Sequence, residues 1–161
     1  MFRKAKPGNS SPPPSSPGAG LRALALGVSP EELGLSQVEG RSVWGVVMDT
    51  GLADDGWHSL VVLADGTTSL YTSAAFGIIG AGTHEQVRLA SDALLASTEQ
   101  RLSSFTAEVD TSTPAEGNVI IRALTFAGSR AVVAVEADLG HGRHAVSPVF
   151  HAAHEVITQM R

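Results

Sequence analysis

Residues 69–87 read SLYTSAAFGIIGAGTHEQV, and the order of residue types in this stretch decides the expected fold. An apolar, strand-like run leads into a cluster of glycines, and the chain leaves that cluster through what looks like the start of a helix. Thr83, followed three residues later by Gln86, has the spacing of a capping box, in which both side chains satisfy backbone amides at the helix start. The stretch therefore predicts a strand, a tight connection and a helix in succession.

Two strands are predicted before this stretch, at residues 42–49 (SVWGVVMD) and 57–63 (WHSLVVL), because both runs are apolar and rich in β-branched residues. Asp65-Gly66 follows the second run, and this dipeptide between two strand-like segments is a strong signal for a hairpin turn. The chain then returns through TTSLYTS at 67–73, which predicts a third strand.

Three helices are predicted from their start signals and apolar patterns. The stretch quoted above continues into a long helix at about 85–105. A final helix is expected to open at Ser147-Pro148, where a capping residue precedes a proline in the first turn. The same pair at Ser29-Pro30, followed by two acidic residues, predicts a short helix near the N-terminus.

Two more strands, at 118–126 and 130–138, are predicted to form a second hairpin with its turn at 127–129. Two hairpins separated by a helix most economically make one five-stranded antiparallel sheet, with the central and C-terminal helices packed on it. The sequence therefore predicts an α+β fold of the kind shared by profilin-like, roadblock-like and sensor-type domains. Such a topology selects no function by itself.

The first twenty residues differ in composition from the rest of the chain. They contain five prolines among serines and glycines, and three basic residues close to the start. This composition predicts a disordered basic arm over 1–20 and a single domain over 21–161. The arm is expected to be a solvated tail, or alternatively a segment that touches an anionic surface or a proline-binding module.

Charge and composition exclude several classes of function. Residues 1–22 hold four basic residues and no acidic one, while the whole chain has a formal net charge of −5, so its body is acidic and unsuited to binding nucleic acid. The chain has no cysteine, which excludes thiolate catalysis and Cys-ligated metal sites. The start lacks the apolar core of a secretion signal, and no stretch is suited to crossing a bilayer. We therefore expect a soluble, cytoplasmic protein without stable membrane association.

The glycines of the opening stretch have two interpretations. Gly77, Gly80 and Gly82, together with Thr83 and Arg88, stand just before or within the first turns of a helix, where backbone amides could bind an anion. The spacing Gly-x-x-Gly-x-Gly is not a dinucleotide fingerprint, and no Lys-Ser or Lys-Thr follows as in a phosphate-binding loop. Close packing of strand against helix is therefore the favoured interpretation.

Histidines are frequent near the C-terminus, and the four within fourteen residues are His141, His144, His151 and His154. The spacings HExxH and HxxEH, which are typical of zinc enzymes, are absent. The apolar stripe of the last helix also leaves His151 on the solvated side. No metal site and no cofactor are therefore predicted.

Acid–base and nucleophilic chemistry have candidates but no motif. The carboxylates at strand ends and turns are Asp49, Asp54, Asp55 and Asp65. Aspartate favours turns for backbone reasons alone. A serine hydrolase would combine Ser69 or Ser73 with His58 or His84, but no Gly-x-Ser-x-Gly sequence is present. A non-enzymatic protein is therefore predicted, with an unrecognised hydrolase as an alternative.

The central helix has apolar residues on more than one side, which predicts that something besides its own sheet covers it. A second copy of the chain is the simplest cover, because symmetric dimers are the commonest oligomers. The alternative is that residues 106–117 or the first helix cover the second side. The predicted interaction surface consists of Val87, Leu89, Ala93, Leu94 and Ala96.

The segments VWGVVMDTG, DGTTSLYTSAAFGIIGAG and SPVFHAAHEVITQMR resemble a bacterial family of small proteins over about residues 40–161. That resemblance implies no particular activity. VWGVVMDTG and the order of helices and strands are more distantly similar to roadblock / dynein-light-chain domains, which are small dimeric modules that regulate GTPases and motors. Those domains place two strands before the central helix and three after it, the reverse of the order predicted for this chain.

These observations predict a homodimeric protein-interaction, adaptor or regulatory module whose further protein partner the sequence does not identify. The first alternative is a small-ligand sensor with a pocket between sheet and helix. The aromatic residues expected near that pocket are Trp44, Trp57, Tyr71 and Phe76.

Overall fold

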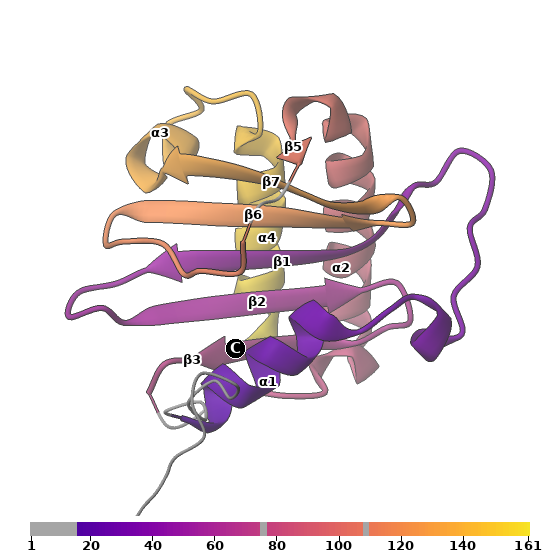
Figure 1. The fold of residues 1–161 in the computed structure, drawn as a ribbon, viewed down its shortest axis with the longest axis horizontal. Coiled ribbons are helices and arrows are strands. Elements are labelled where there is room, and N and C mark those ends of the chain that lie inside the picture. Colours follow the sequence, from indigo (N-terminus) through magenta and orange to yellow (C-terminus); the bar gives the residue numbers. More distant parts are fainter. Residues whose placement is uncertain (1–15, 75–76, 108–109) are drawn as a thin grey trace, which may run out of the picture.

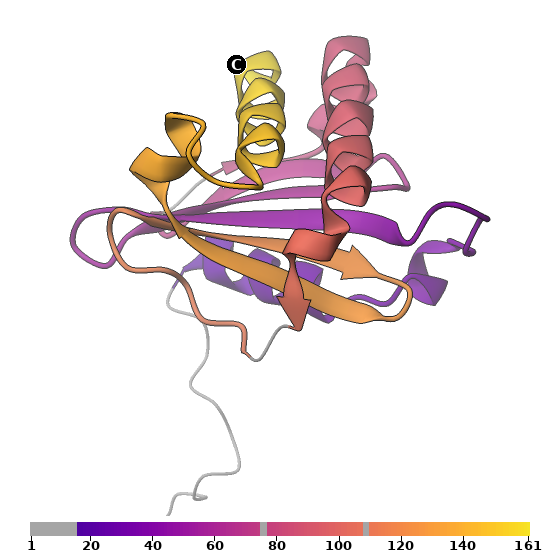
Figure 2. The ribbon, with the colours of Figure 1, turned by 90° about the horizontal axis from the view of Figure 1, so that it is seen from above.

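The computed structural model describes residues 16–74, 77–107 and 110–161, and it has three layers. A single antiparallel sheet forms the middle layer, α2 and α4 lie on one face, and α1 lies on the other (Figures 1 and 2). The strands are β1 (Val43–Gly51), β2 (Trp57–Leu63), β3 (Thr68–Thr72), β4 (Gly77–Ile78), β5 (Thr106–Ala107), β6 (Asn118–Thr125) and β7 (Gly128–Val135). The α-helices are α1 (Pro17–Gly27), α2 (Glu85–Gln100), α3 (Glu136–Gly140) and α4 (Ser147–Met160).

The sheet has seven strands in the order β4-β3-β2-β1-β6-β7-β5. The prediction of an α+β fold with one antiparallel sheet is confirmed, but the number of strands was wrong. The two additional strands, β4 and β5, have two residues each and lie at the two edges of the sheet. A two-residue strand is too short to produce an alternating pattern, so sequence periodicity does not reveal it.

α1 corrects part of the predicted N-terminal arm, because residues 17–20 are helical. Ser16 accepts a hydrogen bond from the backbone N of Ala19, and Pro17 occupies the first turn. A Cβ at Gly18 would lie 2.0 Å from the carbonyl oxygen of Thr72, so only glycine lets α1 approach β3 this closely. The rest of the predicted arm, residues 1–15, lies outside the described residues.

The helix starts were predicted with mixed success. The pair Ser29 and Glu32 cap each other's backbone, but the helix that follows is a single 3-10 turn at Glu31–Leu33. The capping box at Thr83 and Gln86 was wrong, since the residue before α2 is His84 and the hydroxyl of Thr83 donates to the carbonyl of Gly80.

One helix and one strand end earlier than predicted. α2 ends at Gln100 rather than near residue 105, and a 3-10 turn follows at Leu102–Ser104. The strand predicted at 130–138 ends at Val135, where the chain turns into the short helix α3. The start of α4 at Ser147 is confirmed.

Two apolar cores result from covering both faces of the sheet. The larger core lies between the sheet and the pair α2 and α4, and it includes Met48, Leu60, Leu94, Ile121 and Val156. The smaller core lies between the sheet and α1, and it contains Trp44, Val47, Trp57, Val61, Leu63, Tyr71 and Leu124. All nine positions of β1 are buried for this reason. In the described part of the chain, no helix is long and apolar enough to cross a membrane.

Candidate functional site

The outer side of α2 is the surface on which the predicted interaction site falls. Val87 and Leu94 point into the larger core and are 1% and 0% exposed, so they cannot contact another molecule. Leu89 is 57% exposed on the opposite side of the helix, and Ala93 and Ala96 are exposed on that same side. The predicted surface is therefore reduced to these three residues, which we call the α2 outer stripe.

Among the residues that the structure describes, neither of the two intrachain covers considered lies on this side of α2. The predicted first helix, now the 3-10 turn at Glu31–Leu33, packs through Leu33 on the smaller core, as α1 does, on the opposite face of the sheet (Figure 2). The backbone carbonyls of residues 110–112 also lie on that opposite face, where they accept hydrogen bonds from Arg22 and Arg122. Within the described residues, the α2 outer stripe is consequently left to solvent.

Hydrogen bonds join the C-terminal half of α2 to the start of β1. Glu99 accepts hydrogen bonds from the backbone N of Ser42 at 2.9 Å and of Val43 at 2.8 Å, and from the Ser42 hydroxyl at 3.0 Å. A hollow of about 390 Å³ lies beside this connection. Its lining is Gly40, Arg41, Val43, Asp92, Leu95, Ala96, Glu99 and Gln100. The outer stripe thus belongs to a helix whose C-terminal half is hydrogen-bonded to the start of β1.

The glycine segment before α2 is shaped by close backbone contacts. A Cβ at Gly77 would lie 2.0 Å from the carbonyl oxygen of Leu70, and a Cβ at Gly82 would lie 1.8 Å from that of Gly66. Gly80 has a φ of +76°, which disfavours other residues. These contacts explain the glycines without a ligand.

The other residues of the predicted anion site offer little to an anion. The hydroxyl of Thr83 donates to the carbonyl of Gly80, and Arg88 lies exposed in the first turns of α2. Anion binding by Gly77, Gly80, Gly82, Thr83 and Arg88 stays a prediction.

A buried ion cluster on the α1 side of the sheet was not predicted. Asp49 of β1 is fully buried, and its Oδ2 lies 2.6 Å from Nη2 of Arg22 and 2.5 Å from Nη1 of Arg122. The hydroxyl of Ser59 on β2 also donates to Asp49. The cluster therefore joins α1, β1, β2 and β6 through one carboxylate.

Backbone carbonyls also accept hydrogen bonds from the two arginines. Arg22 donates to the carbonyl of Thr111 at 2.8 Å, and Arg122 donates to that of Ser112 at 2.8 Å. The hydroxyl and amide of Ser112 in turn donate to Asp110, and these hydrogen bonds hold the pKa of Asp110 below its ordinary value. The buried charges are thus paired and hydrogen-bonded, as buried charges normally are, and the cluster connects parts of the fold.

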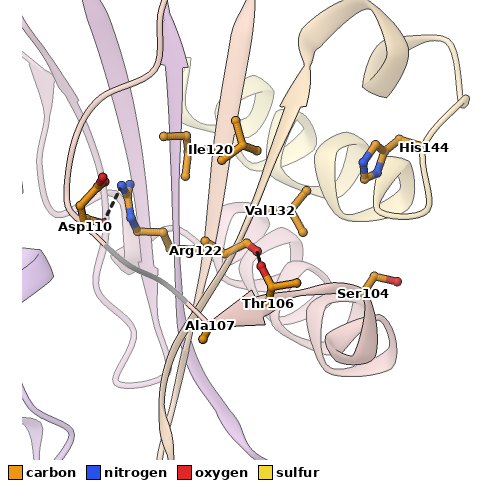
Figure 3. Close-up of a pocket in the computed structure, with 10 residues that line it drawn as sticks. Ser104, Thr106, Ala107, Asp110, Ile120, Arg122, Val132 and His144 are labelled. Carbon is orange, nitrogen blue, oxygen red and sulfur yellow. Dashed lines mark hydrogen bonds between the residues drawn. The ribbon is translucent and has the colours of Figure 1, made fainter.

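A hollow of about 370 Å³ lies over β6 and β7 next to this cluster (Figure 3). Its lining comes from the sheet, β5 and two loops: Ser104, Thr106, Ala107, Asp110, Ile120, Arg122, Ala131, Val132, Val133 and His144. Arg122 is turned toward the backbone of Asp110 at one end, and His144 lies at the other end (Figure 3). Asp110 and His144 thus lie at opposite ends of the hollow (Figure 3).

The aromatic residues expected around a sensor pocket pack into the smaller core instead. Trp44, Trp57 and Tyr71 are buried beneath α1, and the Arg22 guanidinium lies 5.7 Å from the centre of the Trp57 ring. Side chains of α1 such as Leu26 fill the space between helix and sheet. Phe76 lies outside the described residues.

The four carboxylates considered for acid–base chemistry lie in turns or in the buried ion cluster. Asp54 and Asp55 form the turn after β1 with φ of +59° each, and Asp65 accepts a hydrogen bond from the backbone N of Thr67. Asp49 is held in the ion cluster. These four groups are therefore not assembled into one site.

The serines and histidines of the hydrolase alternative are also dispersed. Ser69 is buried, Ser73 accepts a hydrogen bond from the backbone N of Trp57, and His84 is exposed before α2. Among the described residues, neither serine hydrogen-bonds to His58 or His84. The geometry of a nucleophile and base is thus not present there.

The C-terminal histidines do not form a metal site in the described residues, where no group of three histidine, aspartate or glutamate side chains could hold an ion. The ring of His141 hydrogen-bonds the carbonyl of Ala137, and Nδ1 of His144 accepts from the backbone N of Val146. His151 is exposed on α4. His154 instead lies at the contact between α4 and the sheet, where its Nε2 is buried.

Comparisons with family models, curated proteins and solved structures found no match to this chain. The resemblances to a small bacterial family and to roadblock domains therefore stay predictions.

Proposed function

We propose that the protein is a non-enzymatic interaction or regulatory module that acts as a homodimer through the α2 outer stripe. The observation that carries this proposal is that Leu89, Ala93 and Ala96 are exposed on a helix held firmly to the sheet. An exposed leucine is common by itself, but here it continues into a stripe of small residues at helical spacing. Small residues allow a second helix to approach closely.

The stripe is suited to pairing with a copy of itself. In an antiparallel crossing about a twofold axis between residues 92 and 93, each Leu89 would face Ala96 of the second copy, so that a large side chain meets a small one twice. The same register would place Glu85 opposite Gln100, where the amide can donate to the carboxylate. A symmetric dimer requires this kind of self-complementary surface.

The oligomeric state of the full chain tests this proposal. We expect sedimentation equilibrium to show a dimer for the wild type and a monomer for Leu89→Asp. Leu24→Asp is the matched control, because Leu24 is also an exposed leucine but lies on α1, on the opposite face of the sheet. Circular dichroism should show that both variants are folded, since neither leucine is part of a core.

Two results would overturn the proposal. One is a wild-type chain that is monomeric at all accessible concentrations. The other is a dimer that survives Leu89→Asp but is broken by Leu24→Asp, which would move the interface to α1. If the dimer is confirmed, affinity purification from the native host with the tag at the N-terminus should then identify any further protein partner.

A small-ligand sensor is the second candidate, favoured by the hollow over β6 and β7 rather than by the aromatic residues (Figure 3). Its volume is in the range of small-molecule sites, and it combines apolar side chains with Thr106, Asp110 and Arg122. Native mass spectrometry should then detect a bound small molecule that is lost in Ala131→Trp, which fills the hollow. A wild-type spectrum showing the protein mass alone would count against this candidate.

A further inference from the structure

Three buried polar atoms at the contact between α4 and the sheet have no hydrogen-bond partner among the described residues. They are Oγ1 of Thr50, Nδ1 of His58 and Nε2 of His154. Buried polar groups are nearly always paired, so three orphaned atoms in one region require an explanation.

The three residues converge because of strand register and helix position. Thr50 of β1 is directly opposite His58 of β2 in the antiparallel ladder. Thr50 lies two residues from Met48, and His58 two residues from Leu60, so both share the face that carries the larger core. α4 packs on that face, and His154 is close enough that its charge would act on His58.

Burial of this region favours uncharged imidazoles. Burial is the main cause that lowers the pKa of His58, and a charge on His154 lowers that pKa further. Burial also lowers the pKa of His154. The ring of His154 lies 4.4 Å from that of Phe150, which is part of the apolar surroundings.

The charged groups around the pair act in both directions. Glu136 of α3 favours protonation of both imidazoles, and Asp49 of β1 favours that of His58. Arg161 at the end of the chain opposes protonation of both, and His151 of α4 opposes that of His154. Burial outweighs the two carboxylates, so the pKa of each histidine remains lowered.

We propose that Thr50, His58 and His154 form a proton-sensitive contact that holds α4 on the sheet when both imidazoles are neutral and loosens it when they are protonated. A proton on either ring places a charge in a buried region, and the two rings repel each other when both are protonated. Because α4 packs beside α2 on the same face, loosening α4 would also disturb the helix layer that covers the larger core. This proposal does not depend on whether the chain dimerises.

The direction of the pH effect follows from the lowered pKa values. Free histidine in an unfolded chain has a pKa of about 6.5, so the detached state binds protons at a higher pH than the packed state. The stabilising effect is complete above about pH 6.5 and is lost as the pH falls through the pKa of the packed state. Each histidine can raise the opening equilibrium by up to about tenfold per pH unit within that window.

Hydrogen exchange of the full chain at several pH values tests the proposal. We expect the protection factors of α4 amides, after correction for intrinsic exchange, to fall as the pH drops from about 7.5 to about 5.5. His58→Gln with His154→Gln should remove most of this dependence, because glutamine keeps hydrogen-bonding groups but does not titrate. His151→Gln is the matched control, as His151 is exposed one turn away on α4, and it should keep the dependence.

A second measurement covers the case in which the double variant does not fold. Proton NMR of the wild type should show the ring resonances of His58 and His154 titrating below about pH 6.5, together with shifts of α4 amides. Protection factors of α4 that do not change with pH, an unchanged dependence in a folded double variant, or ring titrations at or above 6.5 would each overturn the proposal.

Discussion

Nη1 of Arg122 lies 2.5 Å from Oδ2 of Asp49, and both side chains are almost completely buried in the middle of the sheet. Asp49 also pairs with Arg22 from α1, so one carboxylate contacts two guanidinium groups. The hydrogen bonds from these arginines to the carbonyls of residues 110–112 extend the cluster to the chain segment before β6. Three parts of the chain that are far apart in sequence therefore meet at one residue.

Replacing Asp49 by Ala should destabilise the protein strongly, because two buried arginines would lose the carboxylate that they share. Breaking a buried pair in this way costs about 3–5 kcal/mol. Asp138→Ala is the matched control, since Asp138 forms an exposed pair with Arg143 at 3.1 Å and should cost less than about 1 kcal/mol. Urea unfolding of both variants measures the difference. Equal, small effects would mean that the cluster is not a structural connection.

Leu94→Asp should unfold the chain rather than separate a folded dimer. Leu94 is fully buried in the larger core, where an unpaired carboxylate cannot be accommodated. Leu89→Asp, five residues earlier on the outer stripe, should keep the fold and still unfold in one cooperative thermal transition, because Leu89 is exposed. Thermal unfolding followed by circular dichroism distinguishes the two. A cooperative transition in Leu94→Asp at the wild-type temperature would show that α2 is oriented differently.

Gly82→Ala should destabilise the fold by about 1–3 kcal/mol, because its Cβ would meet the carbonyl oxygen of Gly66 at 1.8 Å and the backbone must move. Gly27→Ala is the control, since its Cβ meets no atom within 4 Å and the residue ends α1. That substitution should be neutral or stabilise by up to about 1 kcal/mol. Chemical denaturation compares the two, and a fully tolerated Gly82→Ala would remove close packing as the reason for this glycine.

Local patterns in the sequence predicted the elements that local interactions define. The strand predicted at 57–63 coincides with β2, and the Asp65-Gly66 turn is present, with φ of +100° at the glycine. The fold class follows from the same hairpins. Tertiary contacts define the elements that were missed: α1 depends on the approach of Gly18 to Thr72, and β5 exists only as a two-residue addition to β7.

The α2 outer stripe and the ion cluster were only partly predictable, because their buried contacts depend on the tertiary structure. A period of 3.6 residues shows that α2 has two apolar sides, but it does not show that Leu94 faces the sheet and Leu89 faces solvent. A signal for the ion cluster was present, because Arg122 interrupts the apolar strand NVIIRALTF and Asp49 ends another. Charged residues inside such runs require buried partners, although the sequence does not say which ones.

Ser112→Ala should raise the pKa of Asp110 toward the ordinary aspartate value. The hydroxyl of Ser112 donates to Asp110 at 2.8 Å and is the largest cause of the lowered pKa, followed by the backbone N of the same residue at 3.0 Å. The charge of Arg122 is a smaller cause of the lowered pKa, so the loss of the Ser112 hydroxyl should dominate the change in the pKa of Asp110. Carbon NMR of the Asp110 carboxyl over a pH titration measures the shift, and Ser103→Ala serves as the control. Because the folded-state pKa is lowered, the turn is stabilised above the ordinary aspartate pKa and loses this contribution as the pH falls through the folded value. An Asp110 titration that is identical in the wild type and Ser112→Ala would show that the turn before β6 is held by the arginines and not by its own side chains.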